Sequence, residues 1–315
     1  MDYEGQICRA PMERAAFMLP VMVGCSYNRC KFCNLFRHLK YRELPMEQIE
    51  AELRRVKNLG GSPKRIFLGD GNAFDMRTEH LLDILERVAY YFPEREMVNM
   101  DATVSGILQK SDAELRELYR HGVRHLYLGI ESGLDDVLAF MKKDHDIAQA
   151  EEAIGRLQEA GLVYDAHIMT GVAGAGRGME NAEALAAFLN RTHPAHVVNF
   201  SMFLHQEVQL YADIEKGTFH PADELANLKE EKRLLSLLGT EEELLYDGFH
   251  DYIAFRVRGR LPGDREKMLA KLEREIARYE GREPIYTFVY GECPNLEKCE
   301  GNVKVWNMED ERRLP

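Results

Sequence analysis

Residues 18–34 read MLPVMVGCSYNRCKFCN. The first seven residues of this stretch are mostly apolar, which predicts a buried strand over 18–24. A polar loop follows and carries Cys25, Cys30 and Cys33, separated by four and by two residues. Three thiolates within nine residues can hold three corners of one iron–sulfur cube. They leave one iron of that cube open to bind a substrate or cofactor.

Other uses of cysteine fit this loop less well. Structural zinc normally takes four ligands, and His38, five residues after Cys33, could supply the fourth. A disulfide framework is disfavoured, because six cysteines among 315 residues are sparse and no secretory segment is visible. Inert buried cysteines would not be expected in a polar Ser-Tyr-Asn-Arg loop. The pattern favours the cluster and leaves zinc as the alternative.

The composition is typical of a globular protein. The chain is 45% hydrophobic and 30% charged, enough for a sizeable core. Its first residues show neither the basic nor the apolar region of a signal peptide, and the apolar stretch 17–23 is too short to span a bilayer. We therefore expect a cytoplasmic protein with no membrane partner and with reduced thiols. The net charge of −12 disfavours a nucleic-acid partner, because it repels phosphate backbones.

Strand, loop and helix alternate along the first two thirds of the chain. Strands are expected at 18–24, 65–69, 97–104, 124–130, 162–169 and 197–204, and helices at 46–59, 78–91, 111–121, 135–141, 147–160 and 181–191. This alternation implies parallel pairing with right-handed crossovers. It predicts an α/β fold, a partial (β/α)6 TIM-like barrel, with an open doubly wound sheet as the alternative. In both folds ligands bind at the C-terminal ends of the strands, where the cysteine loop begins.

The pattern changes after about residue 215. Two long helices are expected at 221–238 and 264–279. We therefore expect a core partial barrel over residues 1–215 and a mainly helical C-terminal extension over 216–315, packed on the core. Cys293 and Cys299 lie in the extension, and with Cys8 they could bind an auxiliary cluster. Free or structural thiols are the other interpretation, because a second cube prefers three or four ligands close together.

In this context the sequence resembles the radical S-adenosylmethionine (SAM) superfamily, and within it the HemN/Elp3-like branch. The likeness rests on the Cys-x4-Cys-x2-Cys motif with Phe32 before its last cysteine, although the usual first spacing is three residues. Residues 67–73, FLGDGNA, lie where the family carries its Gly-Gly-Glu-like motif. Residues 126–133, LYLGIESG, resemble the fourth-strand signature of the branch, and 255–269 resemble the end of its C-terminal region. The likeness covers about residues 16–275.

The resemblance implies two cofactors. Cys25, Cys30 and Cys33 would bind a [4Fe-4S] cluster, and SAM would chelate the open iron through its amino and carboxylate groups. One electron would then cleave SAM to methionine and a 5′-deoxyadenosyl radical. The implied partners are a small or medium-sized substrate and an electron donor such as flavodoxin or ferredoxin. A non-catalytic iron–sulfur or haem-trafficking protein on the same scaffold is the alternative.

The resemblance also implies a set of SAM contacts at the strand ends. They are Phe32, Asp70, Gly71, Asn72, Asp101, Glu131, Ser132, His167 and Gly171. Residues 70–72 would bind the SAM ammonium, Glu131 and Ser132 would bind the ribose or carboxylate region, and Gly171 would approach adenine. Structural roles stay open beside these: core packing for Phe32 and His167, an Asp-Gly turn at 70–72, and a helix N-cap for Ser132. No catalytic residue is singled out.

Overall fold

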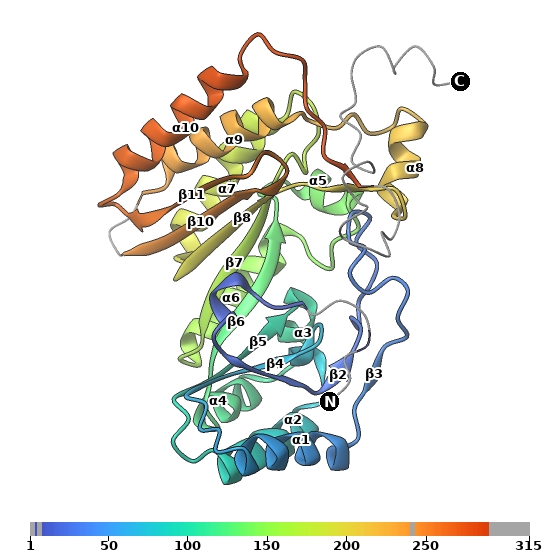
Figure 1. Cartoon of the computed structure of the whole chain (residues 1–315), viewed down its shortest axis with the longest axis vertical. Helices are drawn as coiled ribbons and strands as arrows, with labels where there is room; N and C mark the ends of the chain where they lie inside the picture. Colours follow the sequence, from blue (N-terminus) through green and yellow to red (C-terminus); the bar gives the residue numbers. More distant parts are fainter. Residues whose placement is uncertain (1–3, 5–7, 240–242, 290–315) are drawn as a thin grey trace. The chain divides into compact units, whose positions relative to one another are not determined.

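The computed structural model describes residues 4, 8–239 and 243–289. Strands and helices alternate through most of this part of the chain (Figure 1). Eight of the described strands form one mostly parallel sheet in the order β1-β4-β5-β6-β7-β8-β10-β11. The predicted α/β class with a partial-barrel architecture is therefore confirmed. None of the described helices is long and apolar enough to cross a membrane.

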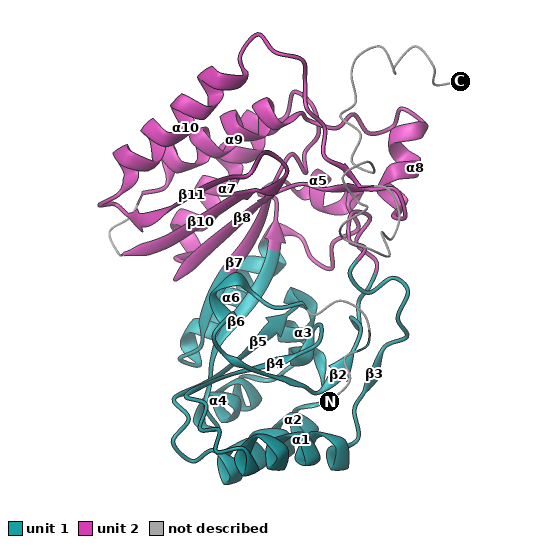
Figure 2. Ribbon diagram, in the orientation of Figure 1, with its two compact units in different colours: residues 1–28, 35–129, 148–165 teal, residues 29–34, 130–147, 166–315 magenta. Residues whose placement is uncertain are grey.

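The chain divides into two compact units (Figure 2). Unit 1 comprises residues 1–28, 35–129 and 148–165, and unit 2 comprises residues 29–34, 130–147 and 166–315. The boundary passes through the cysteine loop, so Cys25 belongs to unit 1, and Cys30 and Cys33 belong to unit 2. The expected domain boundary after residue 215 stays a prediction.

Unit 1 is built on parallel strands. Its sheet strands are β1 (Phe17–Pro20), β4 (Arg65–Gly69), β5 (Met97–Ala102) and most of β6 (Val123–Glu131). Its helices are α1 (Met46–Asn58), α2 (Thr78–Tyr91), α3 (Val104–Leu108), α4 (Asp112–Arg120) and α6 (Ile147–Glu159). Short elements complete it: η1 (Pro11–Glu13), β2 (Met22–Val23), β3 (Arg42–Glu43) and η2 (Ala73–Asp75). A capping box of Ser111 and Glu114 begins α4.

The expected first strand, 18–24, is two strands rather than one. β1 ends at Pro20 and lies at the edge of the sheet, where the missing proline N–H costs no ladder hydrogen bond. β2 then leaves the sheet and pairs antiparallel with β3. The change of partner directs the chain into the cysteine loop.

Unit 2 carries the remaining strands and helices. Its sheet strands are the end of β7 (Val163–Thr170), β8 (His196–Ser201), β10 (Leu244–His250) and β11 (Phe255–Leu261). Its helices are α5 (Asp135–Phe140), α7 (Gly178–Thr192), α8 (Gln209–Glu215), α9 (Glu224–Leu237) and α10 (Arg265–Tyr279). β9 (Leu204–His205) pairs with β12 (Phe288–Val289), and η3 (Asp251–Ile253) joins β10 to β11.

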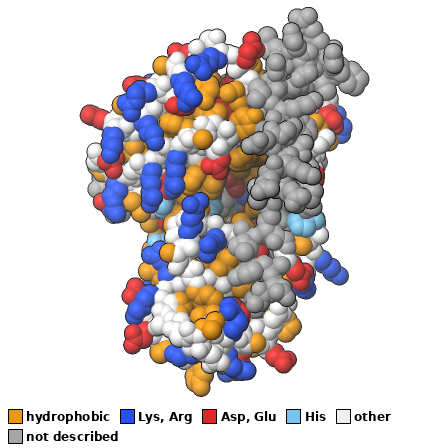
Figure 3. Space-filling model, viewed as in Figure 1, with side chains coloured by type: hydrophobic (Ala, Val, Ile, Leu, Met, Phe, Trp, Pro, Cys, Tyr) orange, Lys and Arg blue, Asp and Glu red, His pale blue; other side chains and the backbone are white. Residues whose placement is uncertain are grey.

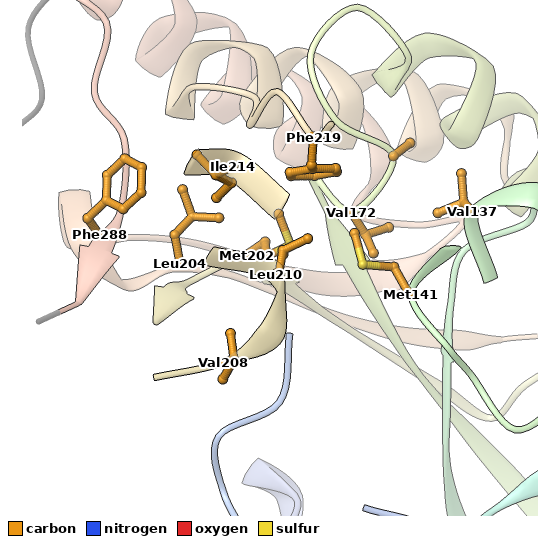
Figure 4. Packing of buried hydrophobic residues seen from close by; sticks show 11 residues of the cluster. Val137, Met141, Val172, Met202, Leu204, Val208, Leu210, Ile214, Phe219 and Phe288 are labelled. Carbon is orange, nitrogen blue, oxygen red and sulfur yellow. The ribbon is translucent and has the colours of Figure 1, made fainter. Parts of the chain in front are cut away.

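An apolar cluster packs α5, α8 and the loops after β7 and β8 together in unit 2 (Figure 4). Its buried members are Val137, Met141, Val172, Ala173, Met202, Leu204, Val208, Leu210, Ile214, Phe219 and Phe288. Phe32, between two of the cysteines, and Met169, near the end of β7, pack against it while partly buried. The cluster therefore links the second half of the cysteine loop to the end of a sheet strand.

The expectation of a mainly helical extension missed a strand pair. β10 pairs parallel with β8, and β11 pairs antiparallel with β10, so residues 244–261 widen the sheet. Both strands contain a glycine, which weakens the sequence signal for a strand. A Cβ on Gly248 would lie 1.8 Å from Oε1 of Glu231, and one on Gly259 would lie 2.5 Å from Sδ of Met268. These glycines allow α9 and α10 to pack closely on the two strands.

Candidate functional site

In unit 1 the loop after β4 lies against the start of the cysteine loop. Gly71 has a φ of +121°, and a Cβ at this position would lie 2.3 Å from the carbonyl oxygen of Gly24. A side chain at residue 71 would therefore collide with the backbone that leads into Cys25. This contact explains why residue 71 is glycine.

A hydrogen-bond network holds this pair of loops. Asn72 Nδ2 donates to Oγ of Ser26 at 3.4 Å and to Oγ1 of Thr103 at 3.3 Å. Both hydroxyls in turn donate to Asp75, at 2.5 Å from Ser26 and 2.8 Å from Thr103. Ser26, Asp75 and Thr103 were not expected from the sequence. Asp75 and Thr103 follow β4 and β5, so the rule that polar residues gather at strand ends could have indicated them.

Two buried oxygens in the same loop have no hydrogen-bond partner among the described residues. They are Oδ2 of Asp70 and Oδ1 of Asn72, and these two residues are only 4% and 5% exposed. The other carboxylate oxygen of Asp70 accepts the backbone N–H of Cys8 at 3.1 Å. Burial raises the pKa of Asp70 to about 6, against the lowering effect of that hydrogen bond. Buried acceptors of this kind need a donor, and a ligand cation would supply one.

Asp101, at the end of β5, belongs to the same acidic region. Burial raises its pKa to about 8, and the negative charges of Asp70 and Glu13 act in the same direction. Glu13 comes from η1, where Oε1 accepts Nδ2 of Asn99 at 2.6 Å and the hydroxyl of Tyr127. Its Oε2 is buried and has no hydrogen-bond partner among the described residues. Segment η1 therefore adds a buried carboxylate beside β5 and β6.

In unit 2, Cys30 and Cys33 lie on one turn. The backbone N–H of Cys33 donates to the carbonyl oxygen of Cys30 at 3.3 Å. Lys31, between them, anchors the turn: its N–H donates to Met141 and its carbonyl accepts the N–H of Leu210. Its ammonium lies 2.8 Å from Asp213 and 3.7 Å from the centre of the Phe140 ring. The turn is thus fixed to the C-terminal end of α5 and to α8.

A buried ion pair lies beside this turn. Nζ of Lys143 is 3.3 Å from Oε1 of Glu131, and the two side chains are only 8% and 11% exposed. Burial raises the pKa of Cys30 to about 11, while the charge of Lys143 lowers it. Burial alone would lower the pKa of Lys143, but the charges of Cys30, Glu131 and Asp144 raise it. Lys143 was not expected from the sequence, where it looks like an ordinary charge in the polar stretch after α5.

Glu131 and Ser132 follow each other at the end of β6 but differ in environment. Glu131 has a φ of +63°, a backbone conformation that non-glycine residues adopt rarely and often at functional sites. Ser132 is fully buried; its Oγ donates to Oδ1 of Asn181 at 2.6 Å and accepts the N–H of Leu134 at 3.1 Å. These bonds favour the structural role for Ser132, at the start of α5.

Gly171 is also part of a structural network. Its N–H donates to Oε2 of Glu230 at 2.9 Å, and a Cβ would lie 2.7 Å from Oδ1 of Asn227. Asn181 donates to the other oxygen of Glu230 at 2.7 Å, so the same carboxylate supports both predicted SAM contacts, Ser132 and Gly171. The close approach of α9 explains the glycine. A contact between Gly171 and adenine stays a prediction.

His167 and Phe32 occupy partly buried positions in unit 2. Burial lowers the pKa of His167 to about 4, and the charges of His196 and Lys143 act in the same direction. Its ring meets the ring of Phe200 edge-on, with centroids 6.0 Å apart. Phe32 packs against the apolar cluster, in agreement with the core interpretation. The SAM contacts of both residues stay predictions.

The described residues do not form a ready-made metal site. Within residues 4, 8–239 and 243–289, no three His, Cys, Asp or Glu side chains are placed to hold a metal ion. The cluster assignment of Cys25, Cys30 and Cys33 therefore stays a prediction from the sequence. The same holds for His38 as a zinc ligand. Cys293 and Cys299 lie outside the described residues, so their part in an auxiliary cluster also stays a prediction.

Two curated proteins resemble this chain over about half its length. A tRNA-2-methylthio-N(6)-dimethylallyladenosine synthase from Hahella chejuensis is 28% identical over 161 residues, 48% of this chain and 35% of that protein. An anaerobic magnesium-protoporphyrin IX monomethyl ester cyclase from Cereibacter sphaeroides is 26% identical over 151 residues, 47% of this chain and 24% of that protein. The chain thus matches about a third or less of the length of these relatives.

Solved structures share the fold at low identity. Methylornithine synthase superposes with a TM-score of 0.55 at 14% identity, covering 95% of this chain and 80% of that one. The radical SAM methyltransferase TsrM from Kitasatospora setae, with cobalamin and a [4Fe-4S] cluster bound, gives a TM-score of 0.51 at 14% identity, covering 64% and 39%. The family model of the radical SAM superfamily matches residues 19–189, more than half of the sequence. The chain therefore belongs to the radical SAM superfamily, whose cofactors are a [4Fe-4S] cluster and SAM.

Proposed function

We propose that this protein is an enzyme that cleaves SAM reductively and uses the resulting radical on a small or medium-sized substrate. The cluster would supply one electron to the S–C5′ bond of SAM, which yields methionine and a 5′-deoxyadenosyl radical. One observation carries the proposal for this chain: the partnerless buried oxygens of Asp70 and Asn72, held against the start of the cysteine loop by Gly71.

The donor set fits a cluster with one open iron. Cys25, Cys30 and Cys33 provide three sulfurs within nine residues, and Cys30 and Cys33 already share a turn. A buried thiol with a pKa of about 11 is protonated at neutral pH, and iron would replace that proton. Lys143 would then offset part of the negative charge that the cluster brings into a buried place.

Asp70 and Asn72 would bind the ammonium group of SAM. Both buried oxygens are acceptors, and an ammonium group has three donors to offer. The surrounding bonds to Ser26 and Thr103 fix the Asn72 side chain, so it need not reorganise on binding. Asp101 adds a second acidic group in the same unit.

The ion pair of Lys143 and Glu131 would serve the other polar parts of SAM. An ammonium group suits the SAM carboxylate, and a carboxylate suits the ribose hydroxyls. Glu131 is held for this role by its positive φ at the end of β6. Contacts of Phe32, His167 and Gly171 with the adenosine part complete the proposal. Ser132 has a structural role, because its hydroxyl donates to Asn181.

The proposal also includes an electron donor and a class of substrate. We place a flavodoxin or ferredoxin as donor, because the radical step consumes one electron. The net charge of −12 opposes a nucleic-acid substrate, although one curated relative is named for a reaction on tRNA. The trafficking alternative is set aside, because both curated relatives are named as enzymes.

A direct test uses protein loaded with iron and sulfide without oxygen. SAM and dithionite are added, and 5′-deoxyadenosine is measured. We expect the nucleoside to form, and we expect Asp70→Asn to weaken SAM binding at least tenfold, because a carboxylate–ammonium bond is lost. Asp83→Asn, on the exposed face of α2, is the matched control and should bind SAM normally. A loaded protein that forms no 5′-deoxyadenosine, or equal SAM affinity in the two variants, would contradict the proposal.

A further inference from the structure

The sheet of unit 2 has one face covered by helices and one face turned away from them. On the covered face, Glu231 of α9 accepts Nδ2 of Asn199 and the hydroxyl of Tyr246, and Gly259 of β11 packs on Met268 of α10. Side chains alternate along a strand, so the intervening residues of β8, β10 and β11 point to the opposite face. That opposite face carries the groups described next.

One row of side chains crosses this face from β7 to β11. The strand register places Met169 opposite Phe200, Phe200 opposite Phe249, and Phe249 opposite Arg256. The rings of Phe200 and Phe249 stack with centroids 5.3 Å apart, and the guanidinium of Arg256 lies 4.3 Å from the centre of the Phe249 ring. We call Met169, Phe200, Phe249 and Arg256 the aromatic row.

The row presents ring edges rather than ring faces. Phe200 lies on the middle strand, with Phe249 stacked on one side and His167 of β7 edge-on at 6.0 Å. Its edge is therefore what remains for a ligand: Phe200 is partly exposed, whereas Phe249 is buried. Aromatic edges carry partial positive charge, so they attract the π face of a flat molecule or an anionic oxygen.

One end of the row packs on the same apolar cluster as the cysteine loop. Met169 packs against the apolar cluster, and so does Phe32, which stands between Cys30 and Cys33. From Met169 the row crosses three strand spacings to Arg256. At about 4.8 Å each, these span roughly 14 Å.

Next to the other end of the row, the guanidinium of Arg258 has N–H groups left to bind a ligand. Asp247 already accepts two hydrogen bonds from Arg256, at 2.7 and 2.5 Å. Arg258, opposite Asp247 on β11, reaches that carboxylate only at 3.7 Å, and its side chain is 70% exposed. Figure 3 shows Lys and Arg side chains, with Asp and Glu side chains among them, over the area of β11 and α10. At this edge the exposed guanidinium of Arg258 is the group that can bind an anion.

We infer that the aromatic row and Arg258 bind the substrate of the proposed radical reaction, an elongated molecule with a flat aromatic or conjugated body and an anionic end. The anionic group, a carboxylate or a phosphate, pairs with Arg258. The body lies along the ring edges, and the far end extends toward the cysteine loop. The inference rests on the proposed function for the chemistry at that far end, but the binding itself needs no radical.

Arginines on an edge strand have a second use, which the test must separate. Charged side chains on β11 can block pairing with another sheet edge. In that case Arg258 serves solubility and binds no ligand.

The experiment measures binding of pyrenebutyrate to the full, cluster-loaded chain by calorimetry without oxygen. Pyrenebutanol and pyrenebutylamine are the neutral and cationic counterparts, and pyrenebutyl phosphate tests the other anion. We expect both anions to bind at least tenfold more tightly than the alcohol, with the amine weakest. The tighter of the two anions identifies the group that the substrate carries.

Two substitutions assign the effect to residues. Arg258→Gln should remove the preference for anions and leave the affinity for the alcohol unchanged. Phe200→Leu should weaken all four probes, because the apolar body loses its contact. Arg274→Gln is the matched control: Arg274 is exposed on α10, which packs on the other face of β11, and its loss should change nothing.

Equal affinity of acid and alcohol, or equal loss in the two arginine variants, would overturn the inference. Concentration-dependent association of the Arg258→Gln chain, with no change in probe binding, would assign the arginine to edge protection instead. Formation of 5′-deoxyadenosine is followed in the same samples. A preference for anions without that nucleoside would refute the proposed function and leave the binding site standing.

Discussion

Both units bury carboxylates near their strands, but they satisfy them differently. In unit 2 every oxygen of Glu224, Glu230 and Glu231 accepts a hydrogen bond. In unit 1 one oxygen of Asp70 and one of Glu13 are buried without a hydrogen-bond partner among the described residues. A satisfied buried acid stabilises a fold, whereas an unsatisfied one is costly unless a ligand completes it. The difference marks Glu224, Glu230 and Glu231 as structural and Asp70 and Glu13 as candidates for binding.

The centre of the satisfied set is His250. Its two ring nitrogens lie 2.8 Å from Glu224 and 3.0 Å from Glu231, and all three side chains are almost fully buried. Burial alone would lower the pKa of His250, but its bonds to the two carboxylates raise it to about 10. The imidazolium therefore ties α9 to β10 at neutral pH.

The largest effect is expected from replacing a cluster cysteine in either unit. Cys25→Ala, from unit 1, and Cys30→Ala, from unit 2, should each abolish iron binding and SAM cleavage, because a cube cannot be held at two corners. Iron content and the visible absorbance of the reconstituted protein measure this. Cys8→Ala is the control and should keep both, since Asp70 accepts the backbone N–H of Cys8, which the substitution retains. Iron and turnover retained in the Cys30 variant would refute the ligand assignment.

The next effect separates structural acids from binding acids. His250→Gln should lower the free energy of unfolding by about 3–5 kcal/mol, because it leaves two buried carboxylates without their cation. Asp70→Asn should leave the free energy of unfolding unchanged or raise it, because it removes a buried charge that lacks a partner.

Urea denaturation of the two variants and the parent chain tests this contrast. SAM binding is measured alongside and should fall only in the Asp70 variant. Equal destabilisation by both substitutions would show that the partnerless oxygens of unit 1 are structural after all.

Much of this arrangement follows from the sequence. The spacing of apolar residues predicted the parallel strands, and the family resemblance pointed to residues 70–72 at the end of one of them. Gly71 shows why this works: β1 and β4 are neighbouring parallel strands, and the chain reaches each loop within a few residues of the strand's end.

The missed features depend on contacts between distant residues. Glu13 meets Asn99 and Tyr127 across more than 80 positions of sequence, and no periodicity encodes that pairing. The β10–β11 pair escaped because Gly248 and Gly259 interrupt its apolar alternation, for reasons that lie in α9 and α10. Lys143 escaped because a buried lysine looks like a surface one until its partner is known.

A smaller effect is expected from the buried ion pair of unit 2. Lys143→Gln should make the cluster harder to reduce by about tenfold, or about 59 mV for one electron, because a positive charge near Cys30 is lost. Redox titration followed by electron paramagnetic resonance measures the potential. Lys142→Gln is the control, because Nζ of Lys142 donates to Oε1 of Gln209, whereas that of Lys143 lies beside Glu131. A potential shifted equally by both substitutions would exclude a specific role for Lys143.

The last effect is on the pH dependence of stability, and its window differs between the units. Asp101 has a pKa raised from 3.8 to about 8, so the folded state holds a proton that the unfolded state has lost. Stability should therefore decline as the pH rises between these values. For His250 the pKa rises from 6.5 to about 10, so its contribution is complete below pH 6.5 and is lost as the pH approaches 10.

Each decline can have a slope of at most about 1.4 kcal/mol per pH unit, and that of Asp101 should be shallower because the residue is partly exposed. Urea midpoints measured from pH 5 to pH 10 in Asp101→Asn and His250→Gln test the assignment. The first substitution should flatten the acidic half of the profile and the second the basic half. If both substitutions flatten the same half, the two units do not titrate independently, and the contrast between their buried acids fails.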